Sequence, residues 1–188
     1  MPRTQYYTAT TMDGFIADEN NSLEWLFAVD RGETGSEEFD EFLADVGALA
    51  MGSTTYEWIL DHEQLLDEPE KWRATYGERP CWVFTRRTLP AIPGANLSFV
   101  RDDVAPIHDE MARAAGDRNI WLVGGGDLVG QFADRGLLDE VRLAVAPVTL
   151  GRGAPLLPRR LEASDLELVD VARRGQFAHL TYRVRPVS

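Results

Sequence analysis

Three consecutive glycines, Gly124 to Gly126, form the segment of this sequence whose residue types most suggest a ligand site. They follow the apolar run Ile120–Val123 and precede a helical pattern that opens at Asp127. Glycine lets the backbone approach a ligand closely, and a helix N-terminus offers free N–H groups and positive charge. A tight strand-to-helix turn is the alternative explanation. Three glycines are more than such a turn needs, so the pattern favours an anion site.

A second segment repeats this arrangement earlier in the chain. The short apolar run at residues 48–51 ends at Gly52, and Ser53, Thr54 and Thr55 stand at the start of a helical pattern. Ordinary N-capping by a hydroxyl side chain would explain these residues as well. Two strand-glycine-helix units in one small domain favour a nucleotide with more than one phosphate.

A third apolar run, residues 81–85, ends in Arg86 and Arg87. Two arginines at a strand end are usually a solvated edge. The chain has a formal net charge of −12, however, and the guanidinium fork matches phosphate geometry. The pair is therefore also a candidate site for an additional phosphate.

The sequence shows no catalytic set of its own. Its three histidines have no metal-ligand spacing, so we expect no metal site. No nucleophile elbow is present, and the glycine segment lacks the Lys-Ser/Thr ending of a phosphate-binding loop for phosphoryl transfer. A nucleotide site without a nucleophile or base fits hydride transfer, in which the cofactor supplies the chemistry.

Length and composition predict one globular domain covering residues 1–188, with 44% hydrophobic and 27% charged residues. The acidic balance argues against binding to nucleic acid or to an anionic membrane surface. Cys81 is the single cysteine and lies in an apolar run, which fits a reducing cytoplasm. The N-terminus lacks a signal-peptide pattern, and no apolar run approaches the roughly 18 residues of a membrane span.

Strands and helices alternate along most of the chain. We expect strands at residues 6–11, 48–51, 81–85, 96–100, 120–123 and 139–146, and helices from 36 to Gly47, after Gly52, at 106–115 and after Asp127. Residues 166–173 and 177–184 alternate like an antiparallel hairpin. The pattern predicts a three-layer α/β fold with a mixed, mostly parallel sheet. Ligands bind such sheets at the carboxyl ends of the strands, where the three candidate loops lie.

Seven segments carry a resemblance to a known family: residues 11–17, 23–26, 51–57, 83–86, 120–128, 137–143 and 146–153. In order and spacing they resemble dihydrofolate reductase-like proteins. The closer likeness is to the reductase domain of the bifunctional riboflavin-biosynthesis deaminase-reductase and to its stand-alone relatives. The resemblance implies a dihydrofolate reductase-like fold and the cofactor NADPH. It also implies a cis peptide bond within Gly124–Gly126 and a homodimer.

The resemblance also implies a set of cofactor contacts: Ala9, Ile16, Gly52, Ser53, Thr54, Thr55, Thr85, Arg86, Arg87, Val123, Gly124, Gly125, Gly126, Asp127 and Leu128. Ala9 and Ile16 would lie along the nicotinamide. The two glycine segments would hold the phosphates, and the end of the third strand would meet the adenosine phosphate.

Two departures from the family bear on the substrate. The riboflavin reductases carry lysine where this chain has Phe15, and they often carry arginine at the position of Ser53. For the substrate side we expect a cleft bounded by Trp25, Phe42 and Tyr56, because aromatic walls suit a flat ring. Trp25 could instead be a core anchor. Glu38 is a further candidate, although its place in the first turn of a helix also suits a surface acid.

The function predicted from the sequence is an NADPH-dependent reductase of a small heterocycle, either a pyrimidine or a pterin. No residue is assigned a catalytic role. The alternative is a nucleotide-binding protein without turnover, which would act as a sensor or sequestering module.

Overall fold

The computed structural model describes residues 2–32 and 35–185. The first elements of the fold are β1 (Thr4–Thr11), β2 (Phe15–Ala17), α1 (Glu24–Phe27), α2 (Gly35–Ala44), β3 (Val46–Gly52), α3 (Ser53–His62), α4 (Glu70–Tyr76) and β4 (Cys81–Phe84). They are followed by β5 (Leu97–Val100), α5 (Val104–Ala115), β6 (Asn119–Gly124), α6 (Gly126–Asp134), β7 (Glu140–Ala146), β8 (Ala154–Pro155), β9 (Leu166–Arg174) and β10 (Phe177–Val184).

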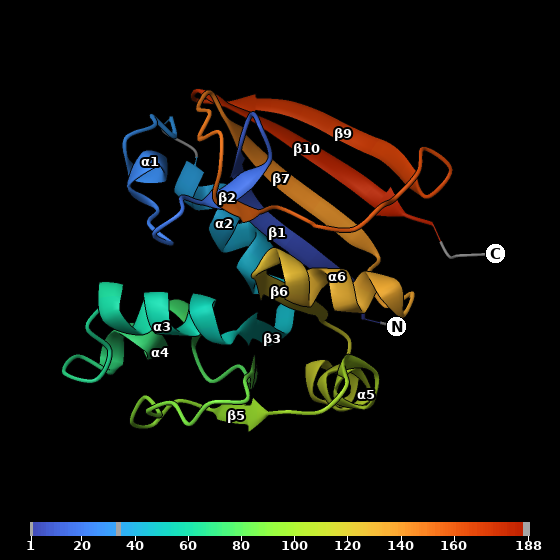
Figure 1. Cartoon of the computed structure of the whole chain (residues 1–188). Coiled ribbons are helices and arrows are strands. Elements are labelled where there is room, and N and C mark those ends of the chain that lie inside the picture. The colour runs from blue at the N-terminus through green and yellow to red at the C-terminus, as the bar shows by residue number, and fades with distance from the viewer. Residues whose placement is uncertain (1, 33–34, 186–188) are drawn as a thin grey trace.

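An eight-stranded sheet runs through the molecule in the order β5-β4-β3-β6-β1-β7-β10-β9 (Figure 1). The pairs from β5 to β7 are parallel, and β10 runs antiparallel to both β7 and β9. This confirms the predicted α/β fold with a mostly parallel sheet and an antiparallel C-terminal hairpin. The parallel order brings the carboxyl ends of β3, β4 and β6 to the same edge of the sheet.

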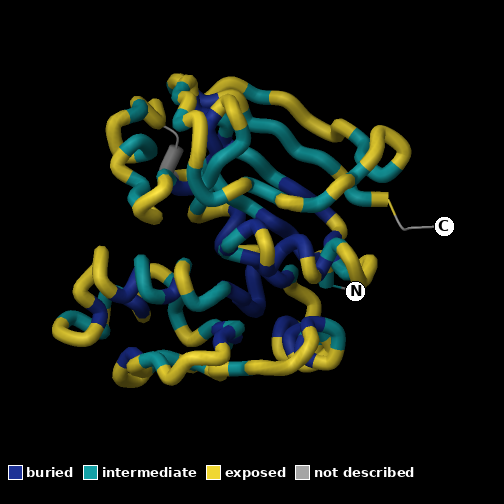
Figure 2. The backbone as a smooth tube through the Cα atoms, viewed as in Figure 1, coloured by how far each residue is buried: buried dark blue, intermediate teal, exposed yellow. Residues whose placement is uncertain are grey.

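Helices cover both faces of the sheet. Alternate side chains of β3 show which helices pack on which face. Ala48 and Ala50 point into a hydrophobic cluster with residues of α5 and α6. Leu49 and Met51 point the other way, into a cluster with residues of α2, α3 and α4. β3 is accordingly buried along most of its length, whereas much of β9 is exposed (Figure 2). Among the described helices, none has both the length and the apolar character to cross a bilayer.

Two local features differ from the sequence-based expectation. Gly47 was expected to end a helix, but it lies inside β3. A Cβ atom at this position would come within 2.6 Å of the carbonyl oxygen of Ala115, so glycine here permits α5 to pack closely on the strand. Residues 154–155 lie outside every predicted strand, but they pair with β2 in a small second sheet. Strands of two and three residues are too short to show a periodic pattern.

The small sheet is supported by the carboxylate of Asp13, in the turn between β1 and β2. Thr11 Oγ1 donates a hydrogen bond to Asp13 Oδ1 at 2.6 Å. The backbone N–H groups of Leu150 and Gly151 donate to Asp13 Oδ2 at 3.0 and 2.7 Å. Asp13 therefore ties the β1–β2 turn to the loop that leads into β8.

We expect this tie to make stability depend on acid pH. The hydrogen bond from Thr11, together with those from the two backbone N–H groups, lowers the pKa of Asp13. Because the folded pKa is lower than the unfolded value of about 3.9, the stabilisation is complete above that value and is lost as the pH falls through the folded pKa. Asp13→Asn keeps the size of the side chain but removes its charge.

Thermal melting of both proteins from neutral to acid pH measures this effect. The melting temperature of wild type should exceed that of Asp13→Asn at neutral pH, and the gap should narrow below about pH 4. A gap that stays constant over the whole range would show that ionisation of Asp13 contributes nothing to the fold.

Candidate functional site

The glycine segment after β6 forms the strand-to-helix connection expected from the sequence. β6 ends at Gly124, whose φ of 141° lies in a region that favours glycine, and the peptide bond between Gly124 and Gly125 is cis, as the resemblance implied. Gly125 is the N-cap of α6, and helix α6 begins at Gly126. Because the N-cap is a glycine, it has no side chain to satisfy the N–H groups of the first turn.

The second glycine segment lies beside the first. Gly52 is the N-cap of α3, so this helix also begins without a capping side chain. A Cβ atom on Gly52 would lie 3.7 Å from the backbone nitrogen of Gly125, and one on Gly124 would lie 3.5 Å from Thr55 Oγ1. The parallel pairing of β3 and β6 thus brings two helix N-termini to one place, where their N–H groups and dipoles together suit a diphosphate.

A cavity of about 290 Å³, here called the glycine cavity, opens at this junction. Many of the residues expected to contact the cofactor line it: Ile16, Thr54, Thr55, Val123, Gly124, Gly125, Gly126 and Asp127. Gly125 shows that the cavity has space for a ligand next to the backbone. A Cβ atom at this position would meet only Ile16 Cδ1, at 3.8 Å, so the glycine leaves room that no neighbouring residue fills.

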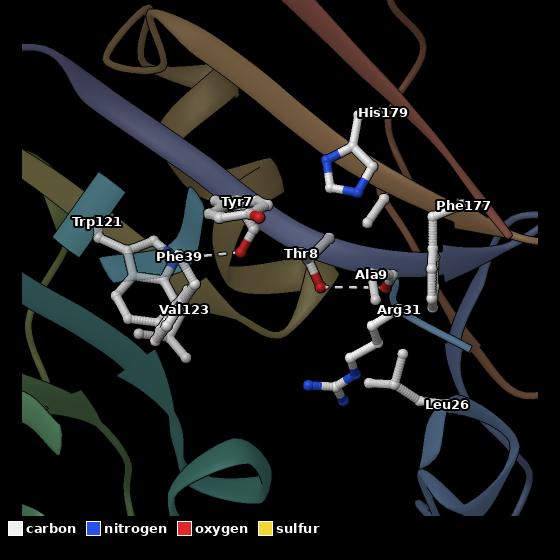
Figure 3. A pocket seen from close by; sticks show the side chains of 11 residues that line it. Tyr7, Thr8, Ala9, Leu26, Arg31, Phe39, Trp121, Val123, Phe177 and His179 are labelled. Atoms are coloured by element: carbon white, nitrogen blue, oxygen red, sulfur yellow. Dashed lines mark hydrogen bonds between the residues drawn. The ribbon is translucent and has the colours of Figure 1, made fainter. Parts of the chain in front are cut away.

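A second cavity of about 270 Å³, here called the aromatic cavity, adjoins the first and shares Thr8 and Val123 with it. Figure 3 shows its lining, in which aromatic and aliphatic side chains surround a few polar groups. Trp121 contacts Phe39 edge-on at 5.6 Å between ring centroids, and its Nε1 donates a hydrogen bond to the carbonyl oxygen of Tyr7 at 3.1 Å. These contacts fix the aromatic wall.

The strand register explains why a cavity exists at this position. Ala9 of β1 pairs with Ala144 of β7, and Ala144 pairs with His179 of β10. Paired residues point to the same face of a sheet, so two small side chains lie in one row and leave space above them. His179 is the next residue of this row, which continues to Ala172 of β9.

The polar groups of the aromatic cavity are Tyr7, Thr8, Arg31 and His179. Burial, followed by the neighbouring carboxylate of Glu38, raises the pKa of Tyr7 to about 12, so its hydroxyl keeps its proton at neutral pH. Glu38 Oε2 lies 3.4 Å from His179 Nδ1. No group of three or more metal-ligating side chains gathers anywhere in the described part of the chain.

Comparison with known families places this site in context. Residues 57–180, about two thirds of the chain, match the model of the RibD C-terminal domain. The chain belongs to the RibD C-terminal domain family. The uncharacterized protein YwjB of Bacillus subtilis (strain 168) is 29% identical over 180 residues, which cover 96% of this chain and 97% of YwjB. Riboflavin biosynthesis protein RibD of Corynebacterium ammoniagenes is 27% identical over 170 residues, covering 85% of this chain but only 47% of RibD.

Solved structures share the same fold. A protein of Shewanella sp. PV-4, provisionally named a riboflavin biosynthesis protein, superimposes with a TM-score of 0.75 at 24% identity over 97% of this chain and 99% of that one. RibD of Acinetobacter baumannii superimposes with a TM-score of 0.70 at 15% identity, over 98% of this chain and 58% of its own. The glycine cavity and the aromatic cavity thus lie in a RibD C-terminal domain fold.

The remaining residues expected at the cofactor lie in different places. Ala9 lines the aromatic cavity, and Gly52 lies next to the glycine cavity. Ser53 lies in the first turn of α3 but does not line either cavity. The side chain of Leu128 is buried in the hydrophobic core, so only its backbone could meet a ligand. The resemblance implied a contact at Leu128 without distinguishing its backbone from its side chain, and in the structure the side chain belongs to the core-facing side of α6.

The end of β4 borders another cavity, of about 230 Å³. Thr85 and Arg87 line it together with Arg101, which follows β5. Arg87 Nη1 and Nη2 bind both carboxylate oxygens of Glu57, at 2.8 and 2.5 Å. Arg86 is exposed and has no ion pair with any acidic residue of the described part of the chain.

The predicted aromatic wall on the substrate side needs correction. Trp25 packs in a small cluster beside Phe177 instead of lining the aromatic cavity, and Leu26 lines it in its place. Phe42 is 5% exposed and packs in the core, edge-on against Tyr7 and Trp121. Neither side chain lines the aromatic cavity, although Phe42 borders the adjoining hollow that also contains Glu38 and His179.

Tyr56 is also placed differently from the prediction. It is fully buried in the core cluster under α3, and its hydroxyl donates a hydrogen bond to the carbonyl oxygen of Pro90 at 2.7 Å. Phe39 and Trp121 line the cavity instead. Phe39 and Phe42 both belong to α2, and spacing in the sequence does not show which turn of that helix reaches the cavity and which reaches the core.

Sequence reasoning missed the role of His179 as a lining residue. The residues around it in the sequence show only a strand pattern. It reaches the cavity because β10 pairs with β7 and places it beside Ala144, which is 35 residues earlier in the chain. Glu38, the remaining candidate for substrate binding, does not line the aromatic cavity itself but lies beside His179 in an adjoining hollow.

Proposed function

We propose that this chain is an NADPH-dependent reductase that transfers a hydride to a small heterocyclic substrate. The observation that carries the proposal is the junction of two cavities. One has two uncapped helix N-termini at its floor, and the other, next to it, has aromatic walls. A dinucleotide bound through its phosphates in the first could present its nicotinamide to a flat ring in the second.

The residues present fit NADPH. The first turns of α3 and α6 would hold the diphosphate, while Ile16 and Ala9 lie near the junction where the nicotinamide would face the substrate. Gly125 leaves open the space that a side chain would fill. NADPH would supply the hydride, and the chain would bind and orient the two rings and exclude water from between them.

The family supports a pyrimidine-like substrate. A relative of known structure from Thermotoga maritima is named a diaminohydroxyphosphoribosylaminopyrimidine deaminase and 5-amino-6-(5-phosphoribosylamino)uracil reductase, and one from Corynebacterium diphtheriae a pyrimidine reductase-like protein. Phe39 and Trp121 provide flat apolar surfaces for such a ring or for a pterin. Phe15, where the riboflavin reductases carry lysine, pairs with Pro155 in the small sheet. The positive charge that the riboflavin reductases carry at this position is therefore missing from this chain.

Oxidation of NADPH in the presence of a panel of acceptors tests the proposal. The panel includes 5-amino-6-(5-phosphoribosylamino)uracil, related pyrimidines and dihydropterins. We expect at least one acceptor to consume NADPH in a one-to-one ratio with reduced product. Tight binding of NADPH without oxidation by any acceptor would favour the alternative, a sensor or sequestering protein. The expected homodimer remains a prediction, which light scattering would measure.

A further inference from the structure

We infer that His179, positioned by Glu38, supplies the proton that accompanies hydride transfer in the aromatic cavity. The inference deepens the proposed reductase function and rests on it. Reducing a C=N or C=O bond adds a hydride to carbon and a proton to nitrogen or oxygen. The nicotinamide supplies the hydride and becomes oxidised, so the proton has to come from a side chain or from water. In the inferred step the imidazolium gives up its Nε2 proton and later regains one from solvent.

The lining of the aromatic cavity leaves few groups able to donate that proton. Its titratable side chains are Tyr7, Arg31 and His179. The guanidinium of Arg31 does not release a proton at physiological pH. Burial raises the pKa of Tyr7 to about 12, which makes its hydroxyl a hydrogen-bond donor but a weak acid. Imidazole is the side chain whose ordinary range of proton exchange includes neutral pH, and general acids are most effective near the working pH.

The position of His179 suits this role. It lies next to Ala144 in the row that contains Ala9 and Ala144, and its side chain is only 17% exposed. In Figure 3 the ring extends from β10 toward Thr8 and Ala9, with one nitrogen directed at them. A proton donor here would face the part of the aromatic cavity that adjoins the glycine cavity through Thr8.

Glu38 faces the other side of the ring. Its Oε2 lies 3.4 Å from His179 Nδ1 and is enclosed by protein, with no hydrogen bond from any described side chain. An enclosed carboxylate oxygen opposite Nδ1 favours the ring orientation and tautomer that keep a proton on Nδ1 after Nε2 has released its own. Glu38 is therefore a positioning residue.

Other charges surround the pair and partly balance Glu38. Arg174 Nε lies 3.4 Å from the same carboxylate oxygen. The charged or titratable groups that line the two hollows on either side of His179 are Arg3, Tyr7, Arg31, Glu140, Arg142 and Asp170. Arg3 and Arg142 are both paired with Glu140, which leaves Glu38 as the carboxylate in contact with the imidazole.

A purely structural pair is the competing explanation, since Glu38 also links α2 to the C-terminal hairpin. Both explanations use the same contact between Glu38 Oε2 and His179 Nδ1, so they differ only in whether the ring gives up a proton during turnover. Nitrogen NMR tests the contact itself, without any substrate, by reading the tautomer of the neutral ring. We expect the neutral His179 of wild type to carry its proton on Nδ1, and Glu38→Gln to weaken that preference. A neutral ring with its proton on Nε2 in wild type would overturn the positioning role of Glu38, because Glu38 Oε2 would then not hold a proton on Nδ1.

Steady-state kinetics with the acceptor that best oxidises NADPH provide a second test of the role of His179. His179→Gln should lower kcat by about a hundredfold or more while NADPH affinity stays unchanged, and the decline of the wild-type rate at alkaline pH should disappear. Glu38→Gln should cause a smaller loss of kcat with the same change in the pH profile. His179→Asn provides a second variant if the glutamine protein melts early.

His108→Gln is the matched control. His108 Nε2 lies 2.8 Å from Thr4 Oγ1, away from both cavities, and glutamine can keep that hydrogen bond, so kcat should not change. Wild-type turnover that persists unchanged in folded His179→Gln would overturn the inference and leave the reductase function intact. Wild type that turns over no acceptor would instead contradict the reductase function, and with it this role for His179.

Discussion

Replacing Arg86 with alanine is expected to weaken NADPH binding about ten- to a hundredfold and to leave NADH binding nearly unchanged. The two cofactors differ by one phosphate, and a charge-assisted hydrogen bond to such a group contributes roughly 1.5–3 kcal/mol. Arg86 follows β4, at the same edge of the sheet as the glycine cavity. In an acidic chain, a cation at this edge is a natural partner for the additional phosphate.

The structure gives a reason to expect Arg86 to contribute more to NADPH affinity than Arg87. Arg87 already holds the carboxylate of Glu57 with both of its terminal nitrogens. Binding a phosphate would require that pair to open, whereas Arg86 has no ion pair among the described residues. Arg87→Ala is therefore the matched control and should change NADPH affinity less.

Titration of both variants with both cofactors at fixed salt measures these affinities, since screening changes the size of exposed charge effects. Equal losses for NADPH and NADH, or no loss for either, would show that the two arginines are a solvated strand end. A greater loss in Arg87→Ala would instead assign the phosphate to the cavity that Arg87 shares with Arg101.

Gly125→Ala should reduce NADPH affinity about five- to a hundredfold with little change in melting temperature. The residue has a φ of −83°, which alanine adopts readily, and its Cβ would make only an ordinary contact with Ile16. The fold therefore tolerates the methyl group. That group would project into the glycine cavity, and forcing extra volume into a filled site costs roughly 1–3 kcal/mol.

Gly126→Ala, in contrast, should lower the stability of the fold. A Cβ atom there would lie 2.3 Å from the carbonyl oxygen of Pro155 and 2.4 Å from that of Leu156, so the backbone after β8 would have to move. We expect a clear fall in melting temperature. Thermal melts and NADPH titrations of the two variants separate the roles of adjacent glycines. A Gly125→Ala protein that binds NADPH normally but melts early would show that Gly125 serves only the turn.

Local patterns predicted most of the fold. Apolar runs that end in Gly52, Thr85 and Gly124 marked three parallel strands, and their carboxyl ends meet where general rules for open sheets place a ligand. Alternation identified β9 and β10 as a hairpin. These features depend on the spacing of apolar residues and on turn residues within short stretches. Both can be read from a single sequence.

The substrate side was harder to predict because it depends on pairing between distant segments. His179 reaches the aromatic cavity only because β10 pairs with β7, opposite Ala144. Phe39 and Phe42 share one helical face, yet one lines the cavity and the other packs in the core, since the cavity meets only the first half of α2. Spacing in the sequence does not record how far along its length a helix lies over a sheet.

Direct titration of the purified protein with NADPH, followed by the fluorescence of the cofactor, tests the central claim that the glycine cavity binds this dinucleotide. We predict saturable binding of one NADPH per chain, weaker binding of NADH, and loss of NADPH affinity in Gly125→Ala. Absence of saturable binding to the folded wild-type protein, or binding that Gly125→Ala leaves unchanged, would contradict the account.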